Sequence, residues 1–206
     1  MDEFYLVKNE AQLTQLYAEA SEASIKKEVN HLHPHYQAII KASPFAILAT
    51  CGSNGLDASP RGDAAGFVAI ADEKTLLLPD RRGNNRLDSL RNILQDSRVA
   101  LLFLIPGLGE TLRVNGRAII STDPQLLNRF TINEKAPKTV LIIKVDTAFF
   151  QCSRAIHRSD LWKRADTDIS KVLPSAGKIL TDLSNSEIDG EKYDRELPER
   201  LKTTLY

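Results

Sequence analysis

The sequence predicts an α+β fold in which a mainly antiparallel sheet of about six strands closes into a small barrel. Between residues 45 and 150, short apolar runs alternate with turn sequences, which is typical of strands joined by hairpins. Helical spacing of apolar residues precedes the strands, and a charged segment with two short helical patterns follows them. Closure into a barrel would remove the exposed edges of the sheet.

The segment 9–42 is expected to be helical, with a break at Pro34. Proline fits the first turn of a helix but not its interior, so Pro34 should start a second helix. Ser43 precedes Pro44, and a residue before proline disfavours the helical conformation. The helical start of the chain should therefore end at residue 43.

The strand patterns are short apolar runs bounded by glycine, proline, asparagine and aspartate. They lie at 45–50, 56–60, 67–71, 75–78, 99–105, 111–121 and 139–145, the last one extending towards residue 150. The sequence Gly52-Ser53-Asn54-Gly55 predicts a hairpin turn between the first two strands.

Three helices are expected among and after the strands, at 85–95, 123–128 and 153–163. In the first, Leu87, Leu90 and Leu94 would share one face. The second has Asp123 as its N-cap and a proline at the next position, a common arrangement at a helix start.

The composition divides the chain into a helical segment at 1–43, a barrel domain at 44–165 and a tail at 166–206. The tail combines many charges with scattered prolines and glycines, and helices are expected near 175–183 and 198–203. We expect the tail to pack on the barrel or on a partner subunit.

Composition excludes several functional classes. The 206 residues carry 27 basic and 27 acidic side chains, and zero net charge argues against a general nucleic-acid binder. The longest apolar run, 99–105, is far shorter than the ~20 residues that span a bilayer. Met1 is followed by two acidic residues rather than by the basic start of a signal peptide, so a cytoplasmic protein is expected.

The two cysteines, Cys51 and Cys152, are expected to be free thiols in a reducing compartment, with a disulfide between them as the alternative. His31, His33 and His35 alternate along the chain, so a helix would not gather all three on one face. No metal site is expected there.

The stretch LLLPDRRGNNRLDSLRNI at 76–93 is the most informative part of the sequence. A strand leads into a loop with three arginines, and a helix follows at once. A helix N-terminus carries unpaired N–H groups and a partial positive charge, and arginines beside it match phosphate oxygens. The pattern therefore predicts a phosphate cradle, although no P-loop motif is present. The plain alternative is a solvated loop with an asparagine cap.

Two further stretches suggest a ligand site. In ASPRGDAAG at 58–66, proline and glycine interrupt a strand and suggest a bulge or a ligand close to the backbone, with Arg61 and Asp63 available for a polar ring edge. The alternative is a surface loop with an internal Arg–Asp pair, worth at most about 1 kcal/mol. In CSRAIHRSDLW at 152–162, Trp162 beside Arg158 could stack on a flat ring, or be a core residue.

With these stretches in view, the chain resembles the pyridoxamine 5'-phosphate oxidase-like group of FMN-binding split barrels, and within it the branch of probable FMN-dependent enzymes. The segments that carry the resemblance are PFAILATCGSNGLDASPRGD, LLLPDRRGNNRLDSLRNI, ETLRVNGRA, CSRAIHRSDLW and the ending YDRELPERLKTTLY. The resemblance implies a six-stranded split barrel and a homodimer with two FMN molecules between the subunits.

The resemblance also implies which residues bind the cofactor. The flavin phosphate would be held by the triplet at the start of the helix and by the loop before it, which match Asn84, Asn85, Arg86, Arg81 and Arg82. Residues under the flavin ring would be Ser59, Arg61 and Asp63. The strand that reaches the flavin would supply Thr111 and Arg113, and Trp162 would reach it from the neighbouring subunit.

The resemblance has limits that bear on the activity. True pyridoxamine phosphate oxidases end in an R-L-x-P tail that helps to hold the substrate, and this chain ends in KTTLY. We therefore expect an FMN-dependent oxidoreductase acting on an unidentified small organic substrate, with no catalytic residue assigned. The alternatives are a non-catalytic flavin or cofactor carrier on the same fold, and a protein-interaction module that binds no flavin.

Overall fold

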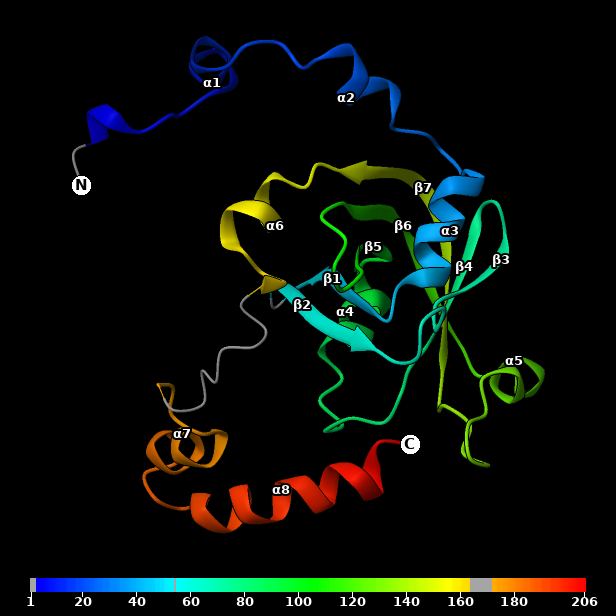
Figure 1. The fold of residues 1–206 in the computed structure, drawn as a ribbon, viewed down its shortest axis with the longest axis vertical. Coiled ribbons are helices and arrows are strands. Elements are labelled where there is room, and N and C mark those ends of the chain that lie inside the picture. The colour runs from blue at the N-terminus through cyan, green and yellow to red at the C-terminus, as the bar shows by residue number, and fades with distance from the viewer. Residues whose placement is uncertain (1–2, 54, 164–171) are drawn as a thin grey trace.

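The computed structural model, which describes residues 3–53, 55–163 and 172–206, confirms the α+β class (Figure 1). One antiparallel seven-stranded sheet forms the body, in the order β2-β1-β5-β6-β7-β4-β3. This is one strand more than the six that the resemblance implies. Among the described residues the two edge strands, β2 and β3, do not pair with each other, so the sheet is not closed by hydrogen bonds.

The strands agree closely with the sequence patterns. They are β1 (Phe45–Gly52), β2 (Gly55–Gly62), β3 (Ala69–Asp72), β4 (Thr75–Pro79), β5 (Arg98–Leu104), β6 (Thr111–Ser121) and β7 (Val140–Gln151). Gly52 pairs with Gly55, as the predicted hairpin requires; Asn54 of that turn lies outside the described residues.

One expectation about β2 is wrong. Instead of ending in a bulge near Pro60, β2 continues to Gly62 with an unbroken register against β1. Proline is tolerated because β2 is an edge strand, so the missing N–H does not interrupt pairing with a second neighbour.

The described helices precede, interrupt and follow the strands along the chain. They are the short 3-10 helix η1 (Glu3–Tyr5), α1 (Glu10–Leu16), α2 (Glu22–Lys26), α3 (Pro34–Ala42), α4 (Asp88–Gln95), α5 (Pro124–Arg129), α6 (Arg154–Ser159), α7 (Ala176–Leu183) and α8 (Gly190–Thr204). The break at Pro34 is confirmed, and the Asp123 side chain caps α5 as predicted by accepting the Gln125 N–H.

Two helix boundaries differ from the sequence expectation. Helix α6 ends at Ser159 because Asp160 adopts a left-handed conformation, φ 49°. Helix α8 begins at Gly190, well before Pro198, because the Asp189 side chain caps it by accepting the Lys192 N–H. Pro198 lies inside this helix.

The hydrophobic core is formed by the sheet together with α3 and α4. Inward-facing residues of β1, β5 and β6 alternate with less buried ones, so each strand contributes one face. The largest fully buried side chains include Phe103, Leu48, Leu101, Leu112, Ile40 and Leu32. On β2 the corresponding positions are half-buried and polar, namely Asp57, Ser59 and Arg61. The edge of the sheet is therefore suited to polar contacts rather than to core packing.

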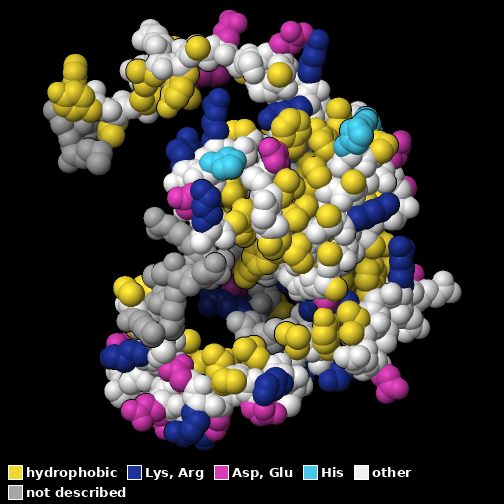
Figure 2. Space-filling view, viewed as in Figure 1, with side chains coloured by type: hydrophobic (Ala, Val, Ile, Leu, Met, Phe, Trp, Pro, Cys, Tyr) yellow, Lys and Arg dark blue, Asp and Glu magenta, His cyan; other side chains and the backbone are white. Residues whose placement is uncertain are grey.

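Helices α7 and α8 form a hairpin whose backbones touch. A Cβ atom on Gly177 would lie 2.0 Å from the Gly190 carbonyl oxygen, so only glycine allows this approach. Figure 2 shows a hollow between this tail and the body on the face viewed. The boundary expected at 165 and 166 lies outside the described residues.

Two global features complete the description. Cys51 and Cys152 are both free thiols, as expected. Across the described ranges, no helix is long and apolar enough to cross a membrane.

A pair of leucine substitutions tests where the core lies. Leu101 is 1% exposed, so Leu101→Ala should lower the free energy of unfolding by about 2–5 kcal/mol, through lost burial and a residual cavity. Leu56 is 88% exposed, and Leu56→Ala should change it by less than about 0.5 kcal/mol. Urea unfolding of both variants measures the difference, and equal losses would contradict this placement of the core.

Candidate functional site

Two ion pairs tie the end of β2 to the loop that follows β4. We call residues 80–87 the arginine loop. Arg61 donates from Nη1 to Asp80 at 2.8 Å, and Arg81 donates from Nε to Asp63 at 2.8 Å. Arg61 and Asp63 therefore do not pair with each other, contrary to the plain alternative for this stretch. The pairs are crossed: strand and loop each supply one arginine and one aspartate.

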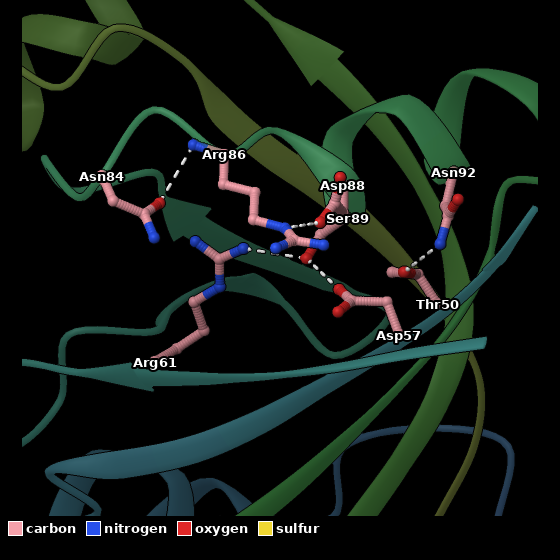
Figure 3. A network of polar contacts seen from close by, with 8 residues as sticks. All are labelled: Thr50, Asp57, Arg61, Asn84, Arg86, Asp88, Ser89 and Asn92. Carbon is pink, nitrogen blue, oxygen red and sulfur yellow. Dashed lines mark hydrogen bonds and ion pairs between the residues drawn. The ribbon is translucent and has the colours of Figure 1, made fainter. Parts of the chain in front are cut away.

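The Arg61–Asp80 ion pair continues into a polar network between β2 and α4, whose side chains are drawn in Figure 3. Arg61 also donates from Nη2 to the Ser89 hydroxyl at 3.1 Å, and that hydroxyl donates to Asp57 at 2.6 Å. Ser89 is 4% exposed, so its hydroxyl is confined to these partners. The Nε atom of Arg61 is buried and has no hydrogen-bond partner among the described residues. An arginine with an unsatisfied buried donor can donate a further hydrogen bond to a ligand oxygen.

The helix after the arginine loop starts later than the sequence suggests. Helix α4 begins at Asp88, and its N-cap position is Leu87, which provides no side-chain cap. Asn85 has a left-handed backbone, φ 59°, and the Asn84 side chain accepts the Arg86 N–H at 3.0 Å. Neither asparagine caps the helix, because Asn84 closes a local turn before the helix begins.

The buried face of α4 also differs from the prediction. Its buried residues are Ser89, Asn92 and Ile93, whereas Leu94 is 77% exposed. Asn92 donates from Nδ2 to the Thr50 hydroxyl at 3.1 Å, which fixes the helix against β1. Gly52 allows this approach, because a Cβ there would lie 2.3 Å from Asn92 Oδ1. The face is polar because it covers the polar end of the sheet.

The arginines of the loop fall into two kinds. Arg81 is held on the inside, since its Nη1 also donates to the Phe130 carbonyl at 2.6 Å. Arg86 pairs with Asp88, but its side chain is 77% exposed. Arg82 is exposed and has no ion pair among the described residues. Arg81 thus fixes the loop to the body, while Arg82, Asn84, Asn85 and Arg86 are exposed. We call residues 82–86 the tip of the loop.

The Asp63 carboxyl is nearly enclosed, with a side chain 2% exposed. Burial by itself raises its pKa, but hydrogen bonds from Tyr206, from the Ala64 N–H and from Arg81 outweigh it and hold the pKa below its ordinary value of 3.8. Asp63 is therefore ionised at neutral pH and accepts hydrogen bonds rather than donating them.

The remaining predicted residues form a second group at a different place. Arg113 of β6 pairs with Leu102 of β5, which pairs with Ile47 of β1. Arg61 of β2 instead pairs with Ala46 of β1, whose partner on β5 is the buried Phe103. Arg113 and Arg61 thus lie on opposite faces of the sheet. Thr111 shares the face of Arg113, as predicted from its spacing.

Local contacts define this second group. Arg113 stacks on Phe149, with its guanidinium carbon 5.2 Å from the ring centre, and Thr111 donates to Gln151 at 3.3 Å. Trp162 is half-buried and donates from Nε1 to the Leu108 carbonyl at 2.7 Å, in the turn that leads to Thr111. A single copy of the chain therefore does not bring Thr111, Arg113 and Trp162 together with the arginine loop.

We call the residues around Arg61 and the arginine loop the first group. Sequence reasoning missed three of them: Asp57, Asp80 and Ser89. Asp57, Ser59 and Arg61 alternate along β2, and this run of polar residues on the inner face was the available signal. Asp80 and Ser89 could not be found this way, because they meet Arg61 across 19 and 28 residues of sequence.

Comparison with known proteins gives a family for this chain. Residues 32–152 match the family model described as pyridoxamine 5'-phosphate oxidase. This range includes all the predicted site residues except Trp162. No curated protein gives a significant match.

Three solved structures illustrate the similarity in fold. HupZ of Group A Streptococcus is 21% identical, with a TM-score of 0.48, over 59% of this chain and 94% of that one. General Stress Protein 26 of Bacillus anthracis is 21% identical, with a TM-score of 0.42, over 55% and 88%. An FMN-binding protein from Syntrophomonas wolfei is 12% identical, with a TM-score of 0.42, over 55% and 86%. Since these scores are low, the family assignment rests on the family model.

The Asp63–Arg81 pair should contribute stability that depends on pH. Asp63→Asn keeps the side-chain volume but removes the charge, so it should lower the free energy of unfolding at pH 7 by about 1–3 kcal/mol. The folded-state pKa of Asp63 is lowered, so this contribution is present above the ordinary pKa of 3.8 and disappears as the pH falls through the folded-state value. Unfolding measured from pH 7 down to pH 3 should show the two proteins converge, and a constant difference would contradict the assignment.

Proposed function

Since the chain belongs to the pyridoxamine 5'-phosphate oxidase family, we propose that it binds FMN and acts as an FMN-dependent oxidoreductase on a small organic substrate. The observation that carries this proposal is the arginine loop, which β2 fixes through crossed ion pairs while its tip stays open. The tip offers two arginines and two asparagine side chains in five residues, 82–86.

The residues at the loop fit a flavin phosphate. Arg82 has its guanidinium free of ion pairs within the described part of the chain, and that of Arg86, with a side chain 77% exposed, forms an ion pair with Asp88. An exposed pair of this kind contributes at most about 1 kcal/mol, so a phosphate dianion can replace Asp88 at little cost. Forked guanidinium donors match phosphate oxygens better than the single charge of lysine.

The inner face of β2 fits a polar ligand edge. Ser59 and Arg61 lie on this face, and the buried Nε of Arg61 lacks a partner among the described residues. A ligand oxygen or ring nitrogen placed there would satisfy that donor, which is otherwise costly to bury. Asp63 contributes indirectly, since its carboxylate holds Arg81 in place.

We also propose that the site is shared between two copies of the chain. Arg113 and Thr111 lie on the opposite face of the sheet from Arg61, and Trp162 hydrogen-bonds the turn that leads to Thr111, so the two groups are separated within one copy. A second copy that brings its own Arg113 face to the arginine loop would complete the site. This division of the residues supports the proposed homodimer.

The protein's contribution to the chemistry is binding and orientation. When bound, FMN supplies hydride or electron transfer through its ring. The arginine loop would anchor the phosphate, β2 would orient the ring edge, and Trp162 of a second copy would cover it and exclude water. Asp63, being ionised and fully hydrogen-bonded, is not assigned a proton-transfer role.

The absorption spectrum of the freshly purified protein tests this proposal first. Flavin bands, with FMN identified in the ligand released on denaturation, would support the site. Bleaching of those bands by an electron donor, followed by turnover, would support the oxidoreductase, whereas bound flavin that never turns over would indicate a carrier. A colourless protein that also fails to bind added FMN would contradict flavin binding and favour a protein-interaction module.

Charge reversal at the loop tip should empty the flavin site. Arg86→Glu places a carboxylate beside the phosphate, so the variant should purify without flavin and bind added FMN at least about a hundredfold more weakly. Arg98→Glu is a matched control, because Arg98 is also an exposed arginine that hydrogen-bonds an aspartate two residues away. FMN titration of both variants measures the effect, and full flavin in Arg86→Glu would remove the phosphate assignment.

Mixing two defective variants tests the shared site. Arg86→Glu and Arg113→Glu should each bind FMN poorly alone, because each damages both sites of a homodimer. Unfolding and refolding them together should restore FMN binding in a fraction of the sites, since a mixed dimer retains Arg86 from one copy opposite Arg113 from the other. Flavin absorbance of the refolded mixture, against each variant refolded alone, checks this. Absence of any restoration, with dimers formed, would contradict a shared site.

A further inference from the structure

The last residue of the sequence lies against the inner ion pair of the site. The Tyr206 hydroxyl donates to Asp63 Oδ1 at 2.6 Å, while Arg81 donates to Oδ2 of the same carboxylate. The guanidinium carbon of Arg81 is 5.7 Å from the centre of the Tyr206 ring. Tyr206 is half-buried, although it follows a helix whose residues are mostly exposed.

A third contact holds the backbone of the same residue. Lys135, which precedes β7, donates from Nζ to the Tyr206 carbonyl at 2.8 Å. Tyr206 is thus bound by β2, by the arginine loop and by the segment before β7. Three elements that meet on one residue, two at its side chain and one at its backbone, define its position better than any single exposed contact could.

Tyr206 is also the polar link between the tail and the body. Other hydrogen bonds and ion pairs of the tail join its own residues, such as Ser175 and Gly177 to Asp194. Within the described residues, the hydrogen bonds and the ring contact that join 172–206 to the body all involve Tyr206. Figure 1 shows the chain turning towards the body after α8, and Figure 2 shows a hollow between part of the tail and the body.

We propose that Tyr206 is a positioning residue of the site: its phenol fastens the tail to the Asp63–Arg81 pair and so fixes the arginine loop. The phenol completes the hydrogen bonding of a carboxylate that is almost sealed from water. When that carboxylate is held, Arg81 keeps its hydrogen bonds to Asp63 and to the Phe130 carbonyl. Arg82 and Arg86, rather than Arg81, then face the solvent.

The charged and titratable groups facing this contact are few. Arg81 and the Ala64 N–H face Asp63, and Lys135 faces the Tyr206 backbone. The hydrogen bond to Asp63 raises the pKa of the Tyr206 phenol, while the same bond lowers that of Asp63. The phenol is therefore neutral and the carboxylate charged across the physiological range, which keeps the contact formed.

Tyr206→Phe tests the proposal because it removes one hydroxyl and keeps the ring. The pKa of Asp63, followed by carboxyl-carbon NMR, should rise, because one of the hydrogen bonds that lower it is lost. Amide exchange in residues 80–87 should accelerate about tenfold, as expected for the loss of one charge-assisted hydrogen bond. Lys135→Ala, which removes only the backbone anchor, should accelerate the same amides to a smaller extent.

Tyr193→Phe is the matched control. Tyr193 lies in α8, the helix that precedes Tyr206, and the guanidinium carbon of Arg200 is 4.3 Å from the centre of its ring, so Tyr193 does not touch the site. Tyr193→Phe should leave unchanged both the pKa of Asp63 and the rate of amide exchange in residues 80–87. If Tyr206→Phe behaved like Tyr193→Phe in these two measurements, the positioning role would be overturned.

The consequence for the cofactor rests on the proposed function. With the loop less well fixed, FMN affinity should fall about tenfold in Tyr206→Phe and stay unchanged in Tyr193→Phe. Unchanged FMN affinity in a variant with faster loop exchange would overturn the link from Tyr206 to the site. If the unmodified protein bound no FMN, the proposed function would fail, and the titration and exchange would still decide the role of Tyr206.

Discussion

The crossed ion pairs between β2 and the arginine loop are the constraint on which the rest of the site depends. A loop of arginines, asparagines and glycine has no regular hydrogen bonding of its own, so its position must come from side chains. Arg61 with Asp80, and Asp63 with Arg81, supply two attachment points in opposite charge order. This order opposes slippage, because a shift of β2 by two residues would place Asp63 against Asp80.

The same constraint explains why the site lies at the edge of the sheet. Inner strands alternate apolar side chains into the core, and a buried arginine there would lack partners. β2 has a neighbour on one side only, so its half-buried inner face can be polar and meet α4 and the loop. Ser89 and Asn92 on the facing side of α4 match this polarity.

Much of the fold could be predicted because its signals are local. β6 was predicted at 111–121, where the structure has it, and Asp123 with Pro124 marked the start of α5. The start of α4 was predicted three residues too early, since Asn84 and Asn85 suit a turn as well as a cap. The start of α8 was missed because Pro198 is a stronger visible signal than Asp189.

The candidate site was predictable in its residue types but not in its partners. The loop arginines and the Arg61–Asp63 stretch were recognised, yet which aspartate pairs with which arginine depends on contacts across 18 to 19 residues. Likewise, period-two spacing places Thr111 and Arg113 on one face, but only the register across β1, β5 and β6 shows that Arg61 lies on the other.

Charge balance shows what kind of anion binding the site can support. Four arginines of the first group, Arg61, Arg81, Arg82 and Arg86, stand against four aspartates, Asp57, Asp63, Asp80 and Asp88. Net charge therefore provides no attraction, and binding must come from how the charges are arranged. Asp63 and Asp80 are turned inward onto their arginines, whereas Arg86 is largely exposed. A phosphate would contact the arginines at the tip while Asp63 and Asp80 remain ion-paired with Arg81 and Arg61. The ion pairs that fix the loop therefore also shield the ligand from the negative charge of these two carboxylates.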